Sequence, residues 1–510
     1  MPSSAGNLPV GTIIAFAADD TTKLPTGWAV CNGAQFSKTA NADLFNMIGY
    51  SNGGSDDLFN LPDLRGQFIR GTGDGVAVPG TSLSPTTAAS NLKANLYYMP
   101  STYHHVTGGA IGPASRDMIL WNSNTTQSFT VSGGDSETRP VNVYFHYIIK
   151  TANEVLMPVG AVIPYAGSDD YSPDEPTWLA CNGNSYKSAL SNYKNLFAVI
   201  AHRFTDTVGA ANFQVPNLTG IFIRGLDSGR GKDPDAQKRE AAPDGTTGAH
   251  VGTLQKYGTS AADFKITIPH FPPGRTLGAF AVQGNDNLHD ANRTSTVSFS
   301  GGVSQSRPKN ASVQFYIHAL HDDKSPSDGF PVGGIIAVPG SGTPDPAIWA
   351  VADGTAVPRA GQYAELWAIT TLSSSTTTTT TAWGNPDELT FNLPNLTGRC
   401  LRATDTRNMG VEDTYGDPDR FVRTAAAPGG TAVGTGSVQD SGTGRPQNAF
   451  NVDFDYPTDV VANAAAVAGV DISDFNTATQ SFAFQTSATE TSPTGVSVRF
   501  FVKYASGGSD

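Results

Sequence analysis

The stretch that decides the fold is Leu61-Pro-Asp-Leu-Arg-Gly-Gln-Phe-Ile-Arg70, because the chain repeats its pattern twice more. It returns as Val215-Pro-Asn-Leu-Thr-Gly-Ile-Phe-Ile-Arg224 and as Leu393-Pro-Asn-Leu-Thr-Gly-Arg-Cys-Leu-Arg402. In each copy a proline follows an apolar residue, and an arginine stands four residues after the glycine. Three agreements in fixed order indicate an internal repeat rather than chance similarity.

The sequence on either side of this stretch repeats in the same order. Each copy opens on Pro-Val-Gly and reaches a tryptophan 18 to 20 residues after that proline, at Trp28, Trp178 and Trp349. In the first copy Leu44, Phe45 and Ile48 follow an i, i+1, i+4 pattern, which predicts an amphipathic helix of about three turns. Ser37 and Gly49 are its predicted caps.

Each copy closes on an alternating apolar pattern typical of a strand, at residues 139–149, 307–317 and 492–502. The repeat therefore predicts three tandem homologous domains, 1–155, 156–328 and 329–510. The fold class expected is mostly β with one short helix per repeat (α+β).

Composition agrees with this fold class and limits the function. The 510 residues include 55 Gly and 33 Pro, and only 15% are charged, which favours turns and short strands. The net charge of −13, without a basic cluster, makes nucleic acid a poor partner. No apolar run is long enough to span a membrane, and the N-terminus lacks the basic region of a signal peptide. Three widely spaced cysteines support neither a disulfide framework nor a cysteine metal site.

These motifs resemble the phage tail collar domain family, which is found in short tail fibres and other receptor-binding fibres of tailed phages and related contractile machines. The resemblance rests on the Pro-Val-Gly opening, the Trp followed by Cys-Asn-Gly, the Leu-Pro-Asp-Leu-Arg-Gly stretch, and the Asp-Pro that ends at Pro234. The closing Arg-Pro-x-Asn of the first two copies also belongs to it, whereas the third copy has lost both that motif and Cys-Asn-Gly. It implies a component of a virion tail or of an extracellular contractile particle, made in the host cytoplasm without a signal peptide. The implied partners are other tail or baseplate proteins.

Family members are usually built around a threefold axis. A chain that carries three copies can close such a ring within itself, because a head-to-tail interface needs only three successive units. We therefore expect a pseudo-trimer in cis, with a homotrimer of three chains as the alternative.

The repeated residues are expected to specify the fold. The predicted core residues are Trp28, Cys31, Trp178, Cys181 and Trp349. A guanidinium makes several directed hydrogen bonds, so the repeated arginines are expected to pair with Asp63, or with carbonyl groups at an interface or turn. These arginines are Arg65, Arg70, Arg139, Arg224, Arg307 and Arg402. The acidic stretch from Asp413 to Asp419 does not match an EF-hand loop and is expected to form solvated turns.

No cofactor, metal site or enzymatic activity is predicted. Members of the family often place a metal on the threefold axis through His-x-His pairs, which needs a histidine from every copy. Here His104 and His105 are weak candidates, and the third copy has no histidine. The sequence contains no nucleophile elbow, phosphate-binding loop or His-Glu-x-x-His motif.

Receptor recognition is predicted to lie in three dissimilar inserts, at about 71–136, 225–304 and 403–490. A common scaffold with dissimilar loops is a usual way to build a binding surface. The first insert carries aromatic residues that suit either contact with sugars or burial at an interface. They are Tyr97, Tyr98, Tyr103 and Trp121. The predicted function is a non-enzymatic tail fibre or tail-tip protein that binds a host cell-surface glycan or protein. The alternative is a structural collar, adaptor or decoration protein without receptor contact.

Overall fold

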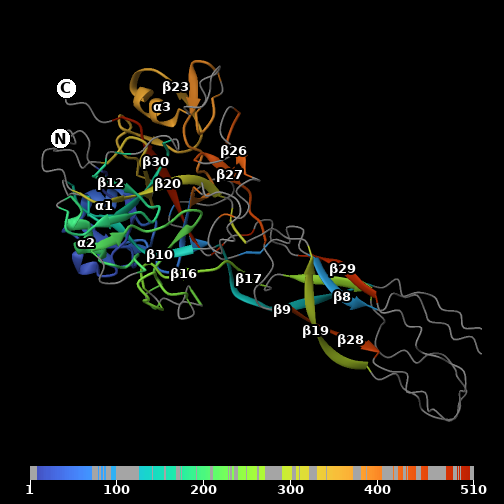
Figure 1. The fold of residues 1–510 in the computed structure, drawn as a ribbon. Coiled ribbons are helices and arrows are strands. Elements are labelled where there is room, and N and C mark those ends of the chain that lie inside the picture. The colour runs from blue at the N-terminus through green and yellow to red at the C-terminus, as the bar shows by residue number, and fades with distance from the viewer. Residues whose placement is uncertain are drawn as a thin grey trace, which may run out of the picture.

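The described strands form a body and an arm that projects from it, as the computed structural model shows (Figure 1). The structure describes residues 8–71, 79, 82–83, 86–87, 93–98, 126–140, 142–153, 157–167, 173, 175–190, 192–206, 211–227, 229, 233–234, 239–248, 250–260, 264–269, 290–300, 306–308, 310–320, 330–339, 342–371, 381–385, 387–404, 417, 423–428, 432, 435–443, 450–457, 478–485, 491, 493 and 495–505. We refer to residues 1–155, 156–328 and 329–510 as segments 1, 2 and 3.

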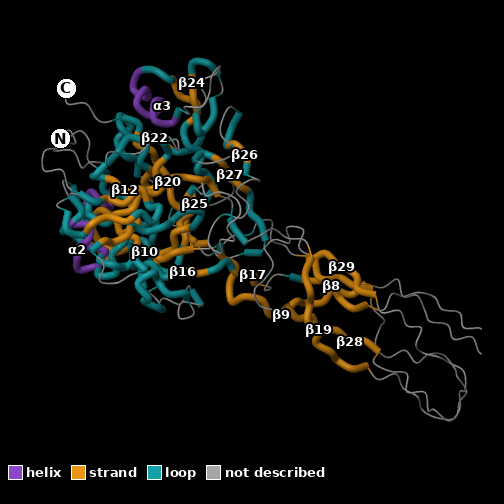
Figure 2. Tube along the Cα trace, viewed as in Figure 1, coloured by secondary structure: helices purple, strands orange, loops and turns teal. Residues whose placement is uncertain are grey.

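The prediction of a mostly β chain with few short helices is confirmed, and the helices lie on the body (Figure 2). They are α1 (Ala42–Ile48), α2 (Lys194–Ile200) and α3 (Ala364–Thr370). Single 3-10 turns cover Thr21–Lys23 (η1) and Gly361–Tyr363 (η3). Each α-helix has seven residues, so the predicted three turns were too many. Gly49 is the C-cap of α1, as predicted, but Ser37 belongs to a strand and Asn41 is the N-cap.

The body is organised around one large sheet to which every segment contributes equivalent strands. The opening strands are β1 (Ile13–Phe16), β11 (Ala161–Tyr165) and β21 (Ile335–Val338). The tryptophan strands are β2 (Trp28–Val30), β12 (Trp178–Ala180) and β22 (Trp349–Val351). The arginine strands are β6 (Phe68–Gly71), β15 (Phe222–Gly225) and β25 (Cys400–Ala403). The closing strands are β10 (Asn142–Lys150), β20 (Asn310–His318) and β30 (Gly495–Lys503).

Shorter strands complete the body. At the rim of the large sheet lie β7 (Ser82–Leu83), β16 (Leu254–Gln255), β26 (Thr424–Ala425) and β27 (Ser437–Gln439). In separate small sheets, β5 (Leu58–Asn60) pairs with β3 (Gln35–Ser37) on one side and β4 (Gly54–Ser55) on the other. Two further small sheets pair β13 (Ser185–Lys187) with β14 (Asn212–Gln214), and β23 (Ala356–Pro358) with β24 (Thr390–Asn392).

Each closing strand joins its own segment to another. It pairs antiparallel with the opening and tryptophan strands of its own segment. It also pairs parallel with an arginine strand of a different segment: β10 with β15, β20 with β25, and β30 with β6. The sheet therefore passes from segment 1 to segment 2, from 2 to 3, and from 3 back to 1.

The hydrophobic core is likewise shared between segments. One buried cluster contains the helix residues Leu44, Leu196 and Leu366, and a second contains all three repeated tryptophans. The ring of Phe330 lies between two of these tryptophans, with centroids 6.2 Å from Trp178 and 5.4 Å from Trp349. The described segments therefore do not have separate cores, because residues of neighbouring segments pack into the same two clusters.

A cavity of about 50 Å³ lies where the arginine, opening and closing strands of the three segments meet. Its walls are apolar and include Phe68, Phe222, Cys400, Tyr147, Phe315 and Phe500. The first three stand at equivalent positions of the arginine strands and form a small buried cluster of their own. Segment 3 thus places a small cysteine where the other two segments place a phenylalanine.

The arm is a second sheet, made mainly from the inserts. Its strands are β8 (Lys93–Tyr98), β9 (Thr126–Arg139), β17 (Gly258–Ser260), β18 (Lys265–Pro269), β19 (Asp290–Ser300), β28 (Phe450–Pro457) and β29 (Ala478–Gln485). Six of them pair antiparallel in the order β9, β18, β29, β8, β19 and β28, and β28 pairs again with β9. These pairings close on themselves into a ring, in which β18 pairs with β9 along Lys265–Pro269 but with β29 only at Lys265 and Ile266.

Candidate functional site

The arm interlocks the three segments, because no strand of the closed ring pairs with a strand of its own segment. Segment 1 supplies β8 and β9, segment 2 supplies β18 and β19, and segment 3 supplies β28 and β29. The inserts were expected to be loops, and this expectation was wrong for the residues that form these strands. Their pairing partners lie hundreds of residues away and leave no local sequence signal.

The strand ends of the arm are held in register across segments. Tyr98 lies opposite Ala478, Pro269 opposite Thr126, and Asp290 opposite Pro457. At the opposite ends of these strands the rings of Phe264, Phe450 and Phe484 pack together, with centroids 4.8 to 5.8 Å apart. Segments 1, 2 and 3 therefore present strand ends together at the far end of the arm.

The predicted recognition residues are only partly within the described structure. Tyr97 and Tyr98 are the last two residues of β8 and pair with Thr479 and Ala478. Tyr103, Trp121 and the candidate metal ligands His104 and His105 lie outside the described residues.

The equivalent arginines of the body make one contact that recurs between all segments. The Arg70 Nε donates to the carbonyl oxygen of Gly398, Arg224 Nε to that of Gly66, and Arg402 Nε to that of Gly220, each at 2.8 Å. Every acceptor is the glycine of the Leu-Pro-x-Leu-x-Gly pattern in another segment. A charged donor bonded to a buried carbonyl is a strong and directional contact, so these arginines fix how the segments sit against one another.

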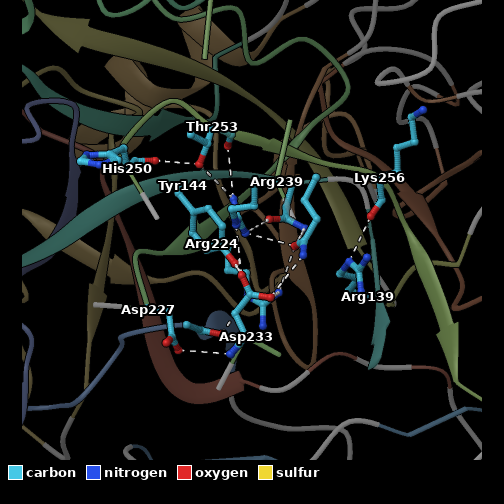
Figure 3. A network of polar contacts seen from close by, with 12 residues as sticks. Arg139, Tyr144, Arg224, Asp227, Asp233, Arg239, His250, Thr253 and Lys256 are labelled. Atoms are coloured by element: carbon cyan, nitrogen blue, oxygen red, sulfur yellow. Dashed lines mark hydrogen bonds and ion pairs between the residues drawn. The ribbon is translucent and has the colours of Figure 1, made fainter. Parts of the chain in front are cut away.

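In segment 2, Arg224 belongs to a buried polar network with Asp233 and Arg239 (Figure 3). The Asp233 carboxylate lies 3.1 Å from Arg239 Nε and 3.6 Å from Arg224 Nη1, and it accepts a hydrogen bond from the Tyr144 hydroxyl. Gln255 accepts from both guanidiniums and donates to Asp233. Because Tyr144 comes from segment 1, the network ties the closing strand of that segment to segment 2.

Segment 3 contains the equivalent network around Asp417. Its carboxylate lies 3.1 Å from Arg402 Nη1 and 2.9 Å from Arg423 Nη1, and Gln439 accepts from both arginines. Burial raises the pKa of Asp417, but the two guanidiniums outweigh it, so the pKa lies below its ordinary value. The expectation that residues 413–419 form solvated turns was wrong at Asp417, which is buried between two arginines.

The sequence held a signal for these networks that the repeat comparison missed. Arg239 follows Asp233 by six residues and Gln255 follows Arg239 by sixteen, and Asp417, Arg423 and Gln439 have the same spacings. Both acids also precede a proline, in Asp-Pro-Asp. These spacings identify the acid–arginine pairs only when the inserts of segments 2 and 3 are aligned at their Asp-Pro motifs.

The other predicted arginines lie in different settings. Arg65 pairs with Asp63, with Nη2 to Oδ2 at 2.8 Å, and this pairing raises the pKa of Arg65. Arg139 Nε donates to the Lys256 carbonyl of segment 2, at 3.1 Å. Arg307 is buried, and its backbone pairs with Gly442 of segment 3. Pairing with Asp63 and contact with carbonyl groups thus both occur, at different arginines.

The predicted core residues are all placed in the interior. Trp28, Cys31, Trp178, Cys181 and Trp349 are between 1 and 7% exposed. Burial raises the pKa of the Cys31 and Cys181 thiols, which disfavours the reactive thiolate.

Within the described part of the chain, no group of three or more His, Cys, Asp or Glu side chains is arranged to hold a metal ion. In the same residues no helix has the length and apolar character needed to cross a membrane.

Comparison with known proteins identifies a family that the first two segments resemble. The family model of the phage tail collar domain matches residues 11–69 and 160–223, which lie in segments 1 and 2. These matches include the opening strands β1 and β11, the helices α1 and α2, and the stretches that carry Arg65 and Thr219.

Three curated proteins are similar to parts of the chain. RhiB of Rhizobium leguminosarum bv. viciae is 33% identical over 148 residues, which are 28% of this chain and 63% of RhiB. StfE of Escherichia coli (strain K12) is 28% identical over 169 residues, 28% of this chain and 89% of StfE. The short tail fiber protein gp12 of Enterobacteria phage T4 is 39% identical over 69 residues, 13% of this chain and 12% of gp12. The matches thus range from a small part of gp12 to most of StfE. The resemblance inferred from the sequence is confirmed, because the family model of the phage tail collar domain matches the first two segments.

Proposed function

We propose that the chain is a non-enzymatic protein of the phage tail fibre type that recognises a host surface receptor through the far end of its arm. The observation that carries this proposal is the closed, interlocked ring of strands, which brings strand ends of all three segments to one place. The stretches of sequence between those ends, 99–125, 270–289 and 458–477, differ from one another. A rigid support that holds dissimilar connecting segments suits recognition.

The body, in this proposal, is a pseudo-threefold unit closed within one chain, with three repeats at 1–155, 156–328 and 329–510. The three Arg-to-glycine contacts, each from one segment to another, support it. Light scattering on the purified protein tests the arrangement, and we expect the mass of one chain, 53.3 kDa. A mass near three chains would support the homotrimer instead.

The recognition step is tested by replacing Tyr97, Tyr98, Tyr103 and Trp121 singly by Ala and measuring binding to host cells or purified surface glycans. Aromatic anchors often dominate binding energy, so at least one variant should lose more than about 1 kcal/mol, roughly fivefold, while melting like the parent. Tyr50→Ala is the matched control, because Tyr50 is an exposed aromatic residue on the body. Unchanged adsorption in all four variants would favour a structural collar, adaptor or decoration protein joined to other tail or baseplate components.

A further inference from the structure

A pocket of about 380 Å³ lies on the body of segment 2, against the closing strand β10 of segment 1. Polar groups line it from Asn182, Asp206, Gln214, Asn217 and Thr219, and apolar walls come from β10 and from the chain around Leu254. Among the described residues that line the pocket, Asp206 is the one ionisable side chain, and it is an acid. Nothing in the collar match or in the arm assigns a role to it.

The loop that forms one wall of the pocket has the same backbone in all three segments. Asp63, Asn217 and Asn395 each form a β-bridge with the second residue after the tryptophan strand, at Asn32, Asn182 and Asp353. The side-chain Oδ1 of each also accepts a hydrogen bond from the backbone N–H two residues later. The three loops can therefore be compared atom by atom.

In segments 1 and 3 a long polar side chain of the chain itself covers this loop. Arg65 Nε donates to Asp63 Oδ1 at 2.9 Å, and Gln67 donates to the Asp63 carbonyl. In segment 3, Arg399 Nη1 lies 3.3 Å from Asn395 Oδ1 and 3.4 Å from the Asn395 carbonyl oxygen. In both loops a guanidinium therefore binds the Asx side-chain oxygen.

Segment 2 lacks these side chains. The residues at the positions of Arg65 and Gln67 are Thr219 and Ile221, and neither can reach the loop acceptors with a charged donor. No side chain of the described residues donates to the Oδ1 or the carbonyl oxygen of Asn217. Asn217 is exposed, whereas Asp63 and Asn395 are half-buried. The pocket opens where the other two loops are covered.

We propose that this pocket binds the guanidinium of an arginine side chain presented by a partner protein. The planar group occupies the place that Arg65 and Arg399 occupy on the equivalent loops, with the Asn217 oxygens as acceptors and the Asp206 carboxylate as the balancing charge. A guanidinium fits better than an ammonium, because its N–H groups lie in one plane and can reach several acceptors at once. The apolar walls accept the aliphatic stem of the arginine.

The test measures binding of N-acetyl-arginine amide to the full chain by titration followed by NMR, beside N-acetyl-lysine amide and its neutral isostere N-acetyl-citrulline amide. We expect the arginine probe to bind at least about fivefold more tightly than the citrulline probe, because charge-assisted bonds are roughly twice as strong as neutral ones. We expect the same advantage over the lysine probe, because a planar guanidinium can reach several acceptors at once and an ammonium cannot. Asp206→Asn should weaken its binding by about tenfold, while the exposed position of Asp206 leaves folding unaffected.

The decisive variant fills the pocket with the chain's own arginine. Asn217→Asp combined with Thr219→Arg recreates the Asp63–Arg65 pair and should abolish binding of the probe without lowering the melting temperature. The matched control is the equivalent change in segment 3, Asn395→Asp with Thr397→Arg, which should leave probe binding unchanged. The proposal is overturned if the filled variant binds the arginine probe like the parent, or if the lysine or the citrulline probe binds as tightly as the arginine probe.

Discussion

Replacing Cys400 by Phe tests whether the centre of the body is packed as the three segments imply. Cys400 lines the central cavity at the position that Phe68 and Phe222 occupy in the other segments. A phenylalanine there places a third ring beside two existing ones. We expect Cys400→Phe to stabilise the body.

The magnitude follows from the volume of the cavity. A residual cavity costs about 24 cal/mol per Å³, so filling about 50 Å³ is worth about 1.2 kcal/mol. With an unfolding entropy of about 2.1 cal/mol/K per residue over 510 residues, this gain raises the melting temperature by about 1 °C. Scanning calorimetry resolves a shift of this size when parent and variant are run under identical conditions.

The matched control is Cys31→Phe, which makes the same chemical change at a buried cysteine away from the cavity. Cys31 is 1% exposed, so the added ring must displace packed neighbours. Overpacking costs about 1 to 3 kcal/mol, so this variant should melt below the parent. If Cys400→Phe melts as low as Cys31→Phe, the cavity is not a space that a ring can fill, and our account of the centre is refuted.

Three further predictions concern the core, the close approach of the segments, and the buried acid of segment 3. Trp178→Ala should lower the free energy of unfolding by about 3 to 5 kcal/mol in denaturant titration, as should the equivalent changes at Trp28 and Trp349. Unchanged unfolding curves for all three variants would contradict the assignment of these tryptophans to the core. Gly225→Ala should destabilise strongly, because its Cβ would lie 1.9 Å from the Leu64 carbonyl oxygen, while Ala403→Gly at the equivalent position should change the melting temperature little. The folded-state pKa of Asp417 lies below its ordinary value, so its contribution is full above about pH 4 and is lost as pH falls through that folded-state pKa. Asp417→Asn should therefore cost about 3 to 5 kcal/mol at pH 7 and progressively less toward pH 2, and a cost independent of pH would contradict the buried ion pair.

The sequence predicted the parts of the fold that depend on local pattern. Leu44 and Ile48 predicted a helix that exists, and the alternation before Lys150 predicted the closing strand β10. The arginine after each Leu-Pro-x-Leu-x-Gly stretch contacts a carbonyl group, which is one of the two kinds of partner that the sequence left open.

The arm could not be predicted in the same way. Strands such as β19 (Asp290–Ser300) are rich in Ser, Thr and Asn, which a local analysis assigns to loops. They form strands because partners from two other segments supply backbone hydrogen-bonding groups: β28 pairs with Asp290–Val297 and β8 pairs with Ser298–Ser300. The buried position of Asp417 was missed for a related reason, since its arginine partners are identified only by comparing two inserts that otherwise differ.

The arrangement of three repeats in one chain that we propose explains how equivalent positions can differ. In a ring of three identical chains every substitution occurs three times, so its cost in stability is multiplied by three. In the ring that we propose within a single chain, Cys400 leaves one cavity worth about 1.2 kcal/mol rather than a larger void bordered by three small side chains. By the same reasoning, the change from Arg65 to Thr219 uncovers one polar loop and leaves the equivalent loop at Arg399 covered. Such a chain can keep its three arginine contacts and still devote a single face to a partner, which three identical chains related by symmetry cannot do.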